Sequence, residues 1–395
     1  MSGISPSRRG LLALAVGAFA GGQAARPAIF RDEFDADDSV STDEWLLPGR
    51  TPARRNHVPT TGGPGLDVAW DVTFDAETGY TLAVAGGRVV VPTWSDGVYA
   101  FTVQDGERAW RYLPPSRFEG GVAVAGGRVC CPTMKGFHVL GSDGDPGWHL
   151  PDYWQRSVVL PFFIFDTYLP VGTTLFTLGD RGLEARDLSS GLLHWHTERV
   201  DGEHVSPNPV AFADGTLYCR EGSLHTRLSA FDAGDGSSLW QRSSEEYHHR
   251  NVAVVEGTLL SAGGFDSNGR LRAFSTDDGS LRWEQAAGTP LYDVAVADGL
   301  AICPGRGGEV HAFDSESGER LWRVDVRDDL GGTVLTDDHL YVHRGRGVEV
   351  RDPATGERRA TYDLADDGRP HELAYASGHL FALRDRTLYA LEVRR

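Results

Sequence analysis

Polar residues, mostly histidine, acidic and amide side chains, recur at intervals of roughly forty residues, just ahead of short apolar segments. Eleven positions belong to this set: Glu119, Asp166, His204, Asn208, His248, His249, Arg250, Tyr292, Asp293, His371 and Glu372. If the segments that follow them converge on one axis, these side chains form a rim that suits a small polar ligand or a metal ion. Their spacing follows a structural repeat rather than a ligand motif. A hydrated channel rim without a ligand is therefore the favoured alternative.

The repeat that spaces these residues is marked by tryptophan. Aligned units carry Trp70, Trp110, Trp148, Trp195, Trp240, Trp283 and Trp322, and Tyr362 takes the eighth place. Successive members lie 40, 38, 47, 45, 43, 39 and 40 residues apart. Each complete unit contains three short apolar segments separated by turns, followed by the tryptophan segment. Four antiparallel strands in about forty residues are typical of a propeller blade.

A polar turn ending in glycine precedes most tryptophan segments, as in "SESG" at 315–318 and "PATG" at 353–356. Glycine can close such a turn because it adopts the left-handed backbone conformation without steric cost. The turns end at Gly106, Gly191, Gly236, Gly279, Gly318 and Gly356. Burying one tryptophan removes roughly 150–250 Å² from water. We therefore expect the tryptophans to join neighbouring blades rather than to form a substrate platform.

The two ends of the chain contain incomplete units. The segment "LDVAWDVTFD" at 66–75 is a lone fourth strand, whereas "ELAYASGHLFALRDRTLYALEV" at 372–393 supplies three strands without a fourth. Together they complete one blade, and such closure removes the exposed strand edges that promote aggregation. The sequence predicts an all-β, eight-bladed propeller whose last blade combines N- and C-terminal strands. Seven blades are the alternative if one weak unit does not form.

These phrases resemble a known repeat. "AFDSESGERLW" at 312–322 is similar to the PQQ-type (pyrroloquinoline-quinone-like) β-propeller repeat, whose common form has Thr before the Gly and Trp four residues after it. Thr355 keeps that threonine, whereas Ser190, Asp278 and Ser317 replace it. The opening "WLLPGRTPARRN" also looks like the lead-in of exported archaeal members. The resemblance covers residues 45–395 and implies a fold that serves both dehydrogenases and non-catalytic scaffolds.

The resemblance also raises the question of catalysis. Some quinone-dependent alcohol dehydrogenases of this class place adjacent cysteines against the cofactor and hold calcium with Asp, Glu and Asn side chains. Here Cys130 and Cys131 occupy the place of two valines in the preceding unit, and Cys219 and Cys303 fall at the position of Cys131. Small buried cysteines fill cores well. We therefore predict structural cysteines, no catalytic residue and no cofactor.

One linker departs from the repeat. The segment "YWQRSVVLPFFIF" at 153–165 is longer and more apolar than the other linkers. Exposed apolar segments tend to mark interfaces, so it is a candidate partner-binding loop. Its aromatic residues are Tyr153, Trp154, Phe162, Phe163 and Phe165. The equally open alternative is that the segment folds over the channel as a plug.

The net charge and the N-terminal residues indicate which partners the protein can bind and where in the cell it is located. The net charge of −18 excludes a nucleic-acid groove, which needs clustered cations. Lys135 is the only lysine among 38 basic residues, and this acidic, arginine-rich composition resembles that of salt-loving archaea. Residues 1–25, with Arg8 and Arg9 ahead of a short apolar run, resemble a twin-arginine export signal. Residues 26–44 read as an acidic linker, and no segment is long enough to span a membrane.

The functional prediction follows from these features. We expect an exported, monomeric propeller that acts as a non-catalytic scaffold and binds other exported or cell-surface proteins, or a small ligand, through channel-face loops. The resemblance implies barrel-assembly scaffold proteins as functional relatives. The alternatives are a quinone-dependent dehydrogenase and a sugar- or metal-binding surface protein.

Overall fold

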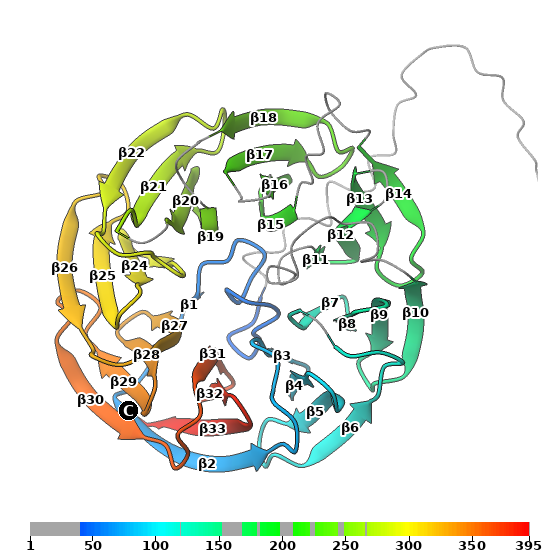
Figure 1. The fold of residues 1–395 in the computed structure, drawn as a ribbon, viewed down its shortest axis with the longest axis horizontal. Helices are drawn as coiled ribbons and strands as arrows, with labels where there is room; N and C mark the ends of the chain where they lie inside the picture. Colours follow the sequence, from blue (N-terminus) through cyan, green and yellow to red (C-terminus); the bar gives the residue numbers. More distant parts are fainter. Residues whose placement is uncertain are drawn as a thin grey trace, which may run out of the picture.

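The protein is seen here in a computed structural model that describes residues 40–118, 120–151, 168–179, 182–197, 208–221, 226–243, 249–264 and 267–394. These residues form no helix, and their strands build eight four-stranded antiparallel blades around a central axis (Figure 1). The predicted eight-bladed β-propeller is confirmed, and the seven-bladed alternative is wrong. Within the described ranges, no helix could span a membrane.

The first four blades follow the chain from the innermost strand outward. Blade one contains β3 (Ala83–Ala85), β4 (Arg88–Thr93), β5 (Gly97–Thr102) and β6 (Arg108–Tyr112). Blade two contains β7 (Ala123–Ala125), β8 (Arg128–Thr133), β9 (Gly136–Gly141) and β10 (Pro146–Pro151). Blade three contains β11 (Tyr168–Val171), β12 (Thr174–Gly179), β13 (Gly182–Asp187) and β14 (Leu193–His196). Blade four contains β15 (Asn208–Ala213), β16 (Thr216–Glu221), β17 (Arg227–Asp232) and β18 (Ser238–Ser243).

The remaining blades include strands from both ends of the chain. Blade five contains β19 (His249–Val255), β20 (Thr258–Gly263), β21 (Arg270–Ser275) and β22 (Leu281–Ala286). Blade six contains β23 (Ala295–Ala297), β24 (Leu300–Pro304), β25 (Glu309–Asp314) and β26 (Arg320–Asp325). Blade seven contains β27 (Leu330–Thr336), β28 (Leu340–Arg344), β29 (Gly347–Arg351) and β30 (Arg358–Asp363), with β1 (His57–Val58) added parallel to β27. Blade eight contains β31 (Pro370–Ala376), β32 (His379–Arg384), β33 (Thr387–Arg394) and, outermost, β2 (Gly65–Thr73).

Burial falls from the middle of each blade to its outer strand. In β4, "RVVVPT", five of the six residues are buried, because neighbouring blades cover both faces of the strand. In β26, "RLWRVD", no residue is fully buried and exposed positions alternate with half-buried ones. This gradient explains why the second and third strands are continuous apolar runs, while charged residues gather in the fourth strand.

Each tryptophan of a fourth strand packs against the glycine turn of the next blade. A Cβ atom built on Gly106 would lie 2.7 Å from Trp70, and six other glycine turns meet a tryptophan in the same way. Six of the seven indole N–H groups, all except that of Trp283, donate to backbone oxygens of that next blade: Trp70 to Val103 (2.9 Å), Trp110 to Ser142 (3.0 Å), Trp148 to Leu188 (2.8 Å), Trp195 to Ala233 (2.9 Å), Trp240 to Thr276 (2.8 Å) and Trp322 to Pro353 (2.9 Å). The tryptophans therefore join blade to blade, as predicted.

A pair of glycine substitutions can separate this packing from backbone strain. Gly318 (φ 76°) and Gly299 (φ 77°) share the left-handed conformation, so alanine costs about 1–2 kcal/mol at either position. A Cβ on Gly318 would lie 2.5 Å from Trp283, whereas nothing lies within 4 Å of one on Gly299. We expect Gly318→Ala to lower the free energy of unfolding by about 2 kcal/mol more than Gly299→Ala in denaturant titrations. Equal losses would contradict a tight tryptophan–glycine joint.

The ring closes through strands from both termini. β2 pairs antiparallel with β33 from Gly65↔Arg394 to Thr73↔Thr387, which confirms the predicted shared blade. Tyr362, in the eighth place of the tryptophan series, donates its hydroxyl to the Pro64 backbone oxygen at 2.8 Å. The tyrosine therefore joins blade seven to the chain just ahead of β2, at the point where closure depends on residues about three hundred positions apart.

Residues 45–58, called here the channel segment, cross the inside of the ring (blue in Figure 1). Their backbone atoms bond to one innermost strand after another: Trp45 to Val84, Leu46 to Val124, Pro52 to Phe212, Ala53 to Val254, Arg55 to Val296 and Asn56 to Leu335. The side chains of Trp45, Leu47, Ala53 and Val58 are at most 2% exposed. The channel segment is thus an integral part of the core, a role that the sequence did not reveal.

Candidate functional site

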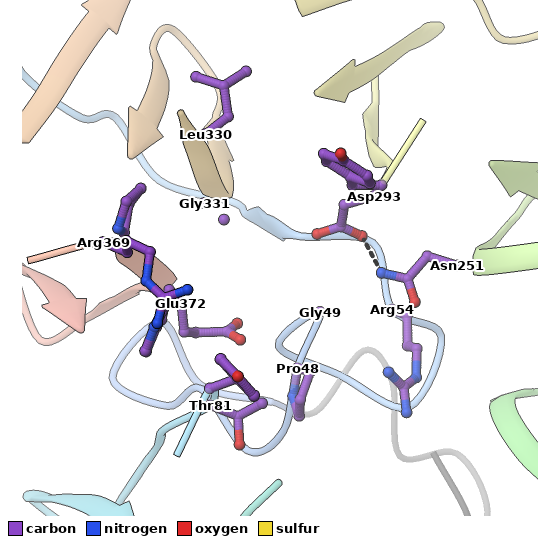
Figure 2. Close-up of a pocket in the computed structure, with 15 residues that line it drawn as sticks. Pro48, Gly49, Arg54, Thr81, Asn251, Asp293, Leu330, Gly331, Arg369 and Glu372 are labelled. Carbon is purple, nitrogen blue, oxygen red and sulfur yellow. Dashed lines mark hydrogen bonds between the residues drawn. The ribbon is translucent and has the colours of Figure 1, made fainter. Parts of the chain in front are cut away.

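A cavity of about 460 Å³ lies at the end of the ring where the innermost strands begin (Figure 2). Pro48, Gly49 and Arg54 of the channel segment line it. The channel segment bonds to the later residues of the innermost strands, so these three residues form the floor. The walls include Tyr80 and Thr81 ahead of β3, Asn251 of β19, Tyr292 and Asp293 ahead of β23, and Arg369 to Glu372 at β31. The cavity is a cup whose mouth we call the channel face.

Asp293 is held firmly in the wall of this cup. Its Oδ1 accepts hydrogen bonds from the Asn251 side chain and from the Val294 backbone N–H, each at 2.9 Å. Its Oδ2 accepts a third, also at 2.9 Å, from the Asn56 side chain of the channel segment. Burial raises the pKa of Asp293 to about 6 although these donors and Arg54 favour the charged form. The carboxylate is therefore mostly ionised at neutral pH.

Glu372 projects from the opposite wall, at the start of β31 (Figure 2). Burial raises its pKa to about 8, and the negative charge of Asp293 acts in the same direction. A hydrogen bond with the Trp45 side chain and the positive charge of Arg54 favour the charged form but do not outweigh burial. Glu372 therefore carries a proton at neutral pH, so the cup holds one charged and one neutral carboxyl group.

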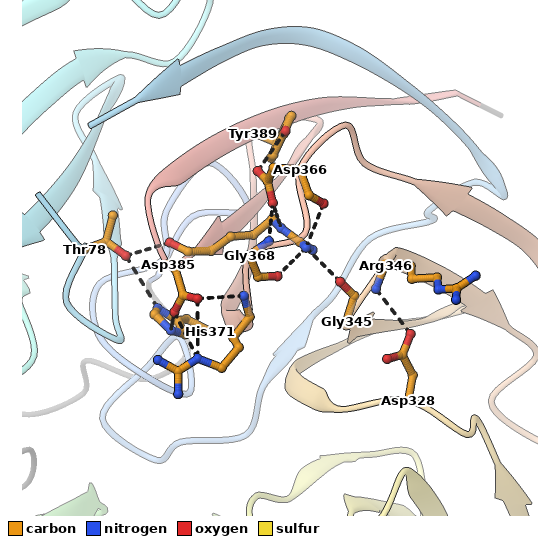
Figure 3. A network of polar contacts seen from close by, with 11 residues as sticks. Thr78, Asp328, Gly345, Arg346, Asp366, Gly368, His371, Asp385 and Tyr389 are labelled. Atoms are coloured by element: carbon orange, nitrogen blue, oxygen red, sulfur yellow. Dashed lines mark hydrogen bonds and ion pairs between the residues drawn. The ribbon is translucent and has the colours of Figure 1, made fainter. Parts of the chain in front are cut away.

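His371 and Arg369 form a separate polar group on the same wall. His371 Nε2 lies 3.0 Å from Asp385 Oδ1, and the Arg369 backbone N–H donates to Asp385 Oδ2 at 3.0 Å (Figure 3). Burial lowers the pKa of His371, although Asp385 opposes this effect. Tyr80 contacts the His371 ring edge to face, with centroids 4.8 Å apart. Asp385 thus balances the charge of Arg369 and holds the histidine in place.

A buried arginine supports this wall from behind. Arg384 of β32 is fully buried, and its Nε donates to Asp366 Oδ1 at 2.5 Å (Figure 3). Its Nη2 donates to the backbone oxygens of Gly345 at 2.7 Å and of Gly368. Tyr389 donates to the other Asp366 oxygen at 2.9 Å. These bonds fix the loop that leads into β31, and therefore the positions of His371 and Glu372.

The rim residues named from the sequence separate into three groups. Tyr292, Asp293, His371 and Glu372 line the cavity. Arg250 stacks over the Tyr292 ring at 5.4 Å, whereas Asn208 and His249 are buried at the starts of β15 and β19 and do not line the cavity. Glu119, Asp166, His204 and His248 lie outside the described residues, as do Tyr153, Trp154, Phe162, Phe163 and Phe165.

Residues of the channel segment were missed in the sequence analysis. Arg54 lines the cavity, and Asn56 holds Asp293. Both residues, together with Arg50, have positive φ angles although none is glycine. The only sequence signal is a short basic run, "RTPARRN", in an acidic chain. Nothing in that run predicts a path across six blades, because each contact uses backbone atoms of a different innermost strand.

The described residues do not fit a quinone cofactor. Cys130 and Cys131 are free, fully buried in β8 and absent from the cavity lining, and burial raises the pKa of both thiols far above the physiological range. The channel segment occupies the axis beneath the cup, and amide groups already engage both oxygens of Asp293. Among the described residues, no group of three or more His, Cys, Asp or Glu side chains is arranged to hold a metal ion.

Comparison with known proteins shows the family of the chain. A family model described as "Outer membrane protein assembly factor BamB" matches residues 66–206, 164–284 and 224–392, which together cover most of the chain. The chain belongs to this family. It is 29% identical to BamB of Yersinia pestis over 218 residues, covering 52% of this chain and 51% of that protein. It is 30% identical to BamB of Shewanella oneidensis over 138 residues, covering 32% of this chain and 34% of that protein.

The alignments to these two relatives span about half of their length or less. Solved structures of two different functions extend the likeness at the level of fold. BamB from Moraxella catarrhalis superposes with a TM-score of 0.66 at 18% identity, covering 83% of this chain and all of the other. The quinohemoprotein alcohol dehydrogenase ADHIIG from Pseudomonas putida gives 0.72 at 14% identity, covering 89% and 80%. At these identities both matches show the shared propeller fold alone.

Proposed function

We propose that this BamB-family protein is an exported, non-catalytic scaffold that binds other exported or cell-surface proteins through its channel face. Support comes from the family model and from the BamB relatives, whose names describe an assembly factor. The predicted export signal at 1–25 and linker at 26–44 agree with this location, although residues 1–39 lie outside the described part of the chain. We further propose that the protein is monomeric and, from its composition, adapted to high salt.

The observation that carries the proposal is the occupied axis of the ring. In the described structure the chain's own residues fill the channel where a large planar cofactor would have to lie, and they leave a shallow polar cup. A rigid ring with such a cup presents loops rather than reactive groups. The best support is therefore for recognition at the channel face.

Apolar side chains gather on this face beside the cup. Tyr80 is 43% exposed and packs against Trp94 with centroids 5.5 Å apart. The Arg117 guanidinium lies over the Trp94 ring at 5.0 Å. Met134, in the neighbouring turn between β8 and β9, is 50% exposed. Aromatic, methionine and arginine side chains are enriched in protein interfaces, so these residues support a protein partner. The candidate loop at 153–165 remains a second, untested proposal.

Site-specific photo-cross-linking tests the proposed function. A photoreactive phenylalanine at Tyr80 or Met134 should give discrete protein adducts in cells of the native host. The same probe at Glu256 or Glu316 should not, because these residues lie in turns at the opposite end of the blades. Adducts from all four positions, or from none, would contradict a binding face. Purified protein mixed with quinone and calcium should show no dye-linked alcohol oxidation, and activity there would favour the dehydrogenase alternative.

A further inference from the structure

The charged groups that line the cup do not balance when both of its carboxyl groups are ionised. Arg369 is matched by Asp385, whose carboxylate it contacts at 3.3 Å. Among the described residues, Arg54 is then the remaining arginine lining the cavity, and it faces two acids, Asp293 and Glu372. At neutral pH, a proton on Glu372 removes this excess negative charge. A cationic group that enters the cup would do the same.

We propose that the cup is a binding site for the cationic end of an arginine or lysine side chain contributed by a protein partner. The inference rests on the proposed function, because it specifies what the partner places at the channel face. Glu372 would pair with the incoming cation, and Asp293 would add its long-range attraction from the facing wall. The cavity of about 460 Å³ is large enough for the end of one such side chain.

Aromatic residues at the mouth suit the same class of ligand. Tyr80 and Tyr292 line the cavity and are 43% and 36% exposed. Cations are attracted to the faces of tyrosine rings because the ring face carries negative partial charge. The chain already uses Tyr292 in this way, because the Arg250 guanidinium lies 5.4 Å from its centroid. An arginine or lysine stem would pack between the rings while its charged end reaches Glu372.

The donor set favours an organic cation over a metal ion. A metal ion needs several oxygen or nitrogen ligands at close range, and the described residues supply no such cluster. Both oxygens of Asp293 already accept hydrogen bonds from Asn251 and Asn56. Among the described residues, Glu372 is the carboxyl group with acceptor capacity left, because the Trp45 side chain can engage only one of its lone pairs. A guanidinium or ammonium group can donate to that carboxylate while its remaining N–H groups meet water or backbone oxygens.

Proton release gives the proposal a measurable signature. The groups that act on Glu372 are Asp293, Trp45 and Arg54. Arg369 and His371, both paired with Asp385, line the same cavity. Two buried groups lie close by: His343, whose pKa burial lowers to about 3, and Cys303, whose thiol pKa burial raises. Of these groups, Glu372 changes charge when a cation enters near neutral pH. Binding must then release about one proton, and affinity must rise about tenfold per pH unit up to about pH 8.

Small probes test this directly on the full-length protein. Calorimetric titration with N-acetyl-arginine amide should show binding that strengthens with pH, with proton release revealed by two buffers of different ionisation enthalpy. The neutral isostere N-acetyl-citrulline amide should not bind. Glu372→Gln should weaken arginine binding at least tenfold at about pH 8.5 and abolish its pH dependence. Glu357→Gln, the same change on an exposed turn residue, should leave both unchanged.

The outcomes separate this site from the scaffold proposal. Three results would each overturn the cation site. They are equal binding of the arginine and citrulline probes, no binding of the arginine probe at about pH 8.5, and displacement of the arginine probe by calcium ions that bind more tightly. None of these results bears on whether photo-cross-links form at Tyr80 or Met134. If Glu372→Gln fails to fold, proton release by the unmodified protein still decides the question. Arginine binding without proton release also overturns the assignment to Glu372.

Discussion

Removing residues 1–58 should lower the thermal midpoint by more than about 10 °C or abolish cooperative unfolding altogether. The deletion takes away the channel segment but keeps β2, so the strand that closes the ring remains. It exposes apolar surface on several blades at once, because Trp45 packs with blades one, seven and eight, whereas Leu47 packs with blades two to four. The ring would then be held only by contacts between neighbouring blades.

The size of this effect follows from burial. Trp45, Leu47 and Val58 are each at most 2% exposed, and full burial of one such side chain contributes about 1.5–3 kcal/mol. Total stabilities are about 5–15 kcal/mol, so several losses of this size are a large fraction of the whole. The single change Trp45→Ala should cost about 3–5 kcal/mol by the same reasoning.

A shorter deletion is the matched control. Removal of residues 1–39 leaves the whole channel segment and should keep the thermal midpoint close to that of the parent chain. Circular dichroism and size-exclusion chromatography report whether each truncated chain still forms a ring. A chain lacking residues 1–58 that unfolds at the parental temperature would show that the channel segment is only loosely docked, contrary to its six sets of backbone hydrogen bonds.

The blades could be predicted from the sequence because their determinants are local and repeated. A glycine such as Gly318 is required by a positive φ angle, and Trp283 fills the space left by its missing Cβ. Both features recur at the same place in successive units. The pairing of the two closing strands could also be predicted, because the chain ends contain complementary incomplete units. In the structure β2 does pair with β33.

The floor of the cup could not be predicted, for a physical reason. The channel segment contacts each innermost strand through single backbone bonds, and such bonds leave no periodic pattern in the side chains. Arg54 and Asn56 sit in left-handed conformations that sequence alone does not suggest for these residues. The wall residues Asp293 and Glu372 could be placed near the rim by counting back from the repeat. Their altered pKa values could not be anticipated, because burial causes them and the channel segment that forms the floor was not predicted.

That burial leads to the second large prediction: Glu372→Gln should stabilise the protein at alkaline pH and leave it nearly unchanged below about pH 4.5. The folded state holds the Glu372 proton up to a pKa of about 8, whereas the unfolded chain releases it near the usual 4.5. The folded state thus binds more protons between these values, and stability falls as pH rises through this window. Glutamine carries no titrating proton, so the variant escapes that loss.

The expected gain is about 2–4 kcal/mol at about pH 9, because one pKa unit corresponds to about 1.4 kcal/mol and Glu372 keeps some contact with solvent. Denaturant titrations at about pH 4 and pH 9 should therefore converge in acid and separate in base. Glu357→Gln on the exposed turn should follow the parent at both values. A Glu372→Gln variant that is destabilised equally at both pH values would mean that the carboxyl group is charged and paired in the folded state.

The same substitution that stabilises the fold at alkaline pH is expected to weaken arginine binding at that pH. An acid that serves binding is distinguished from a structural acid by these opposite effects.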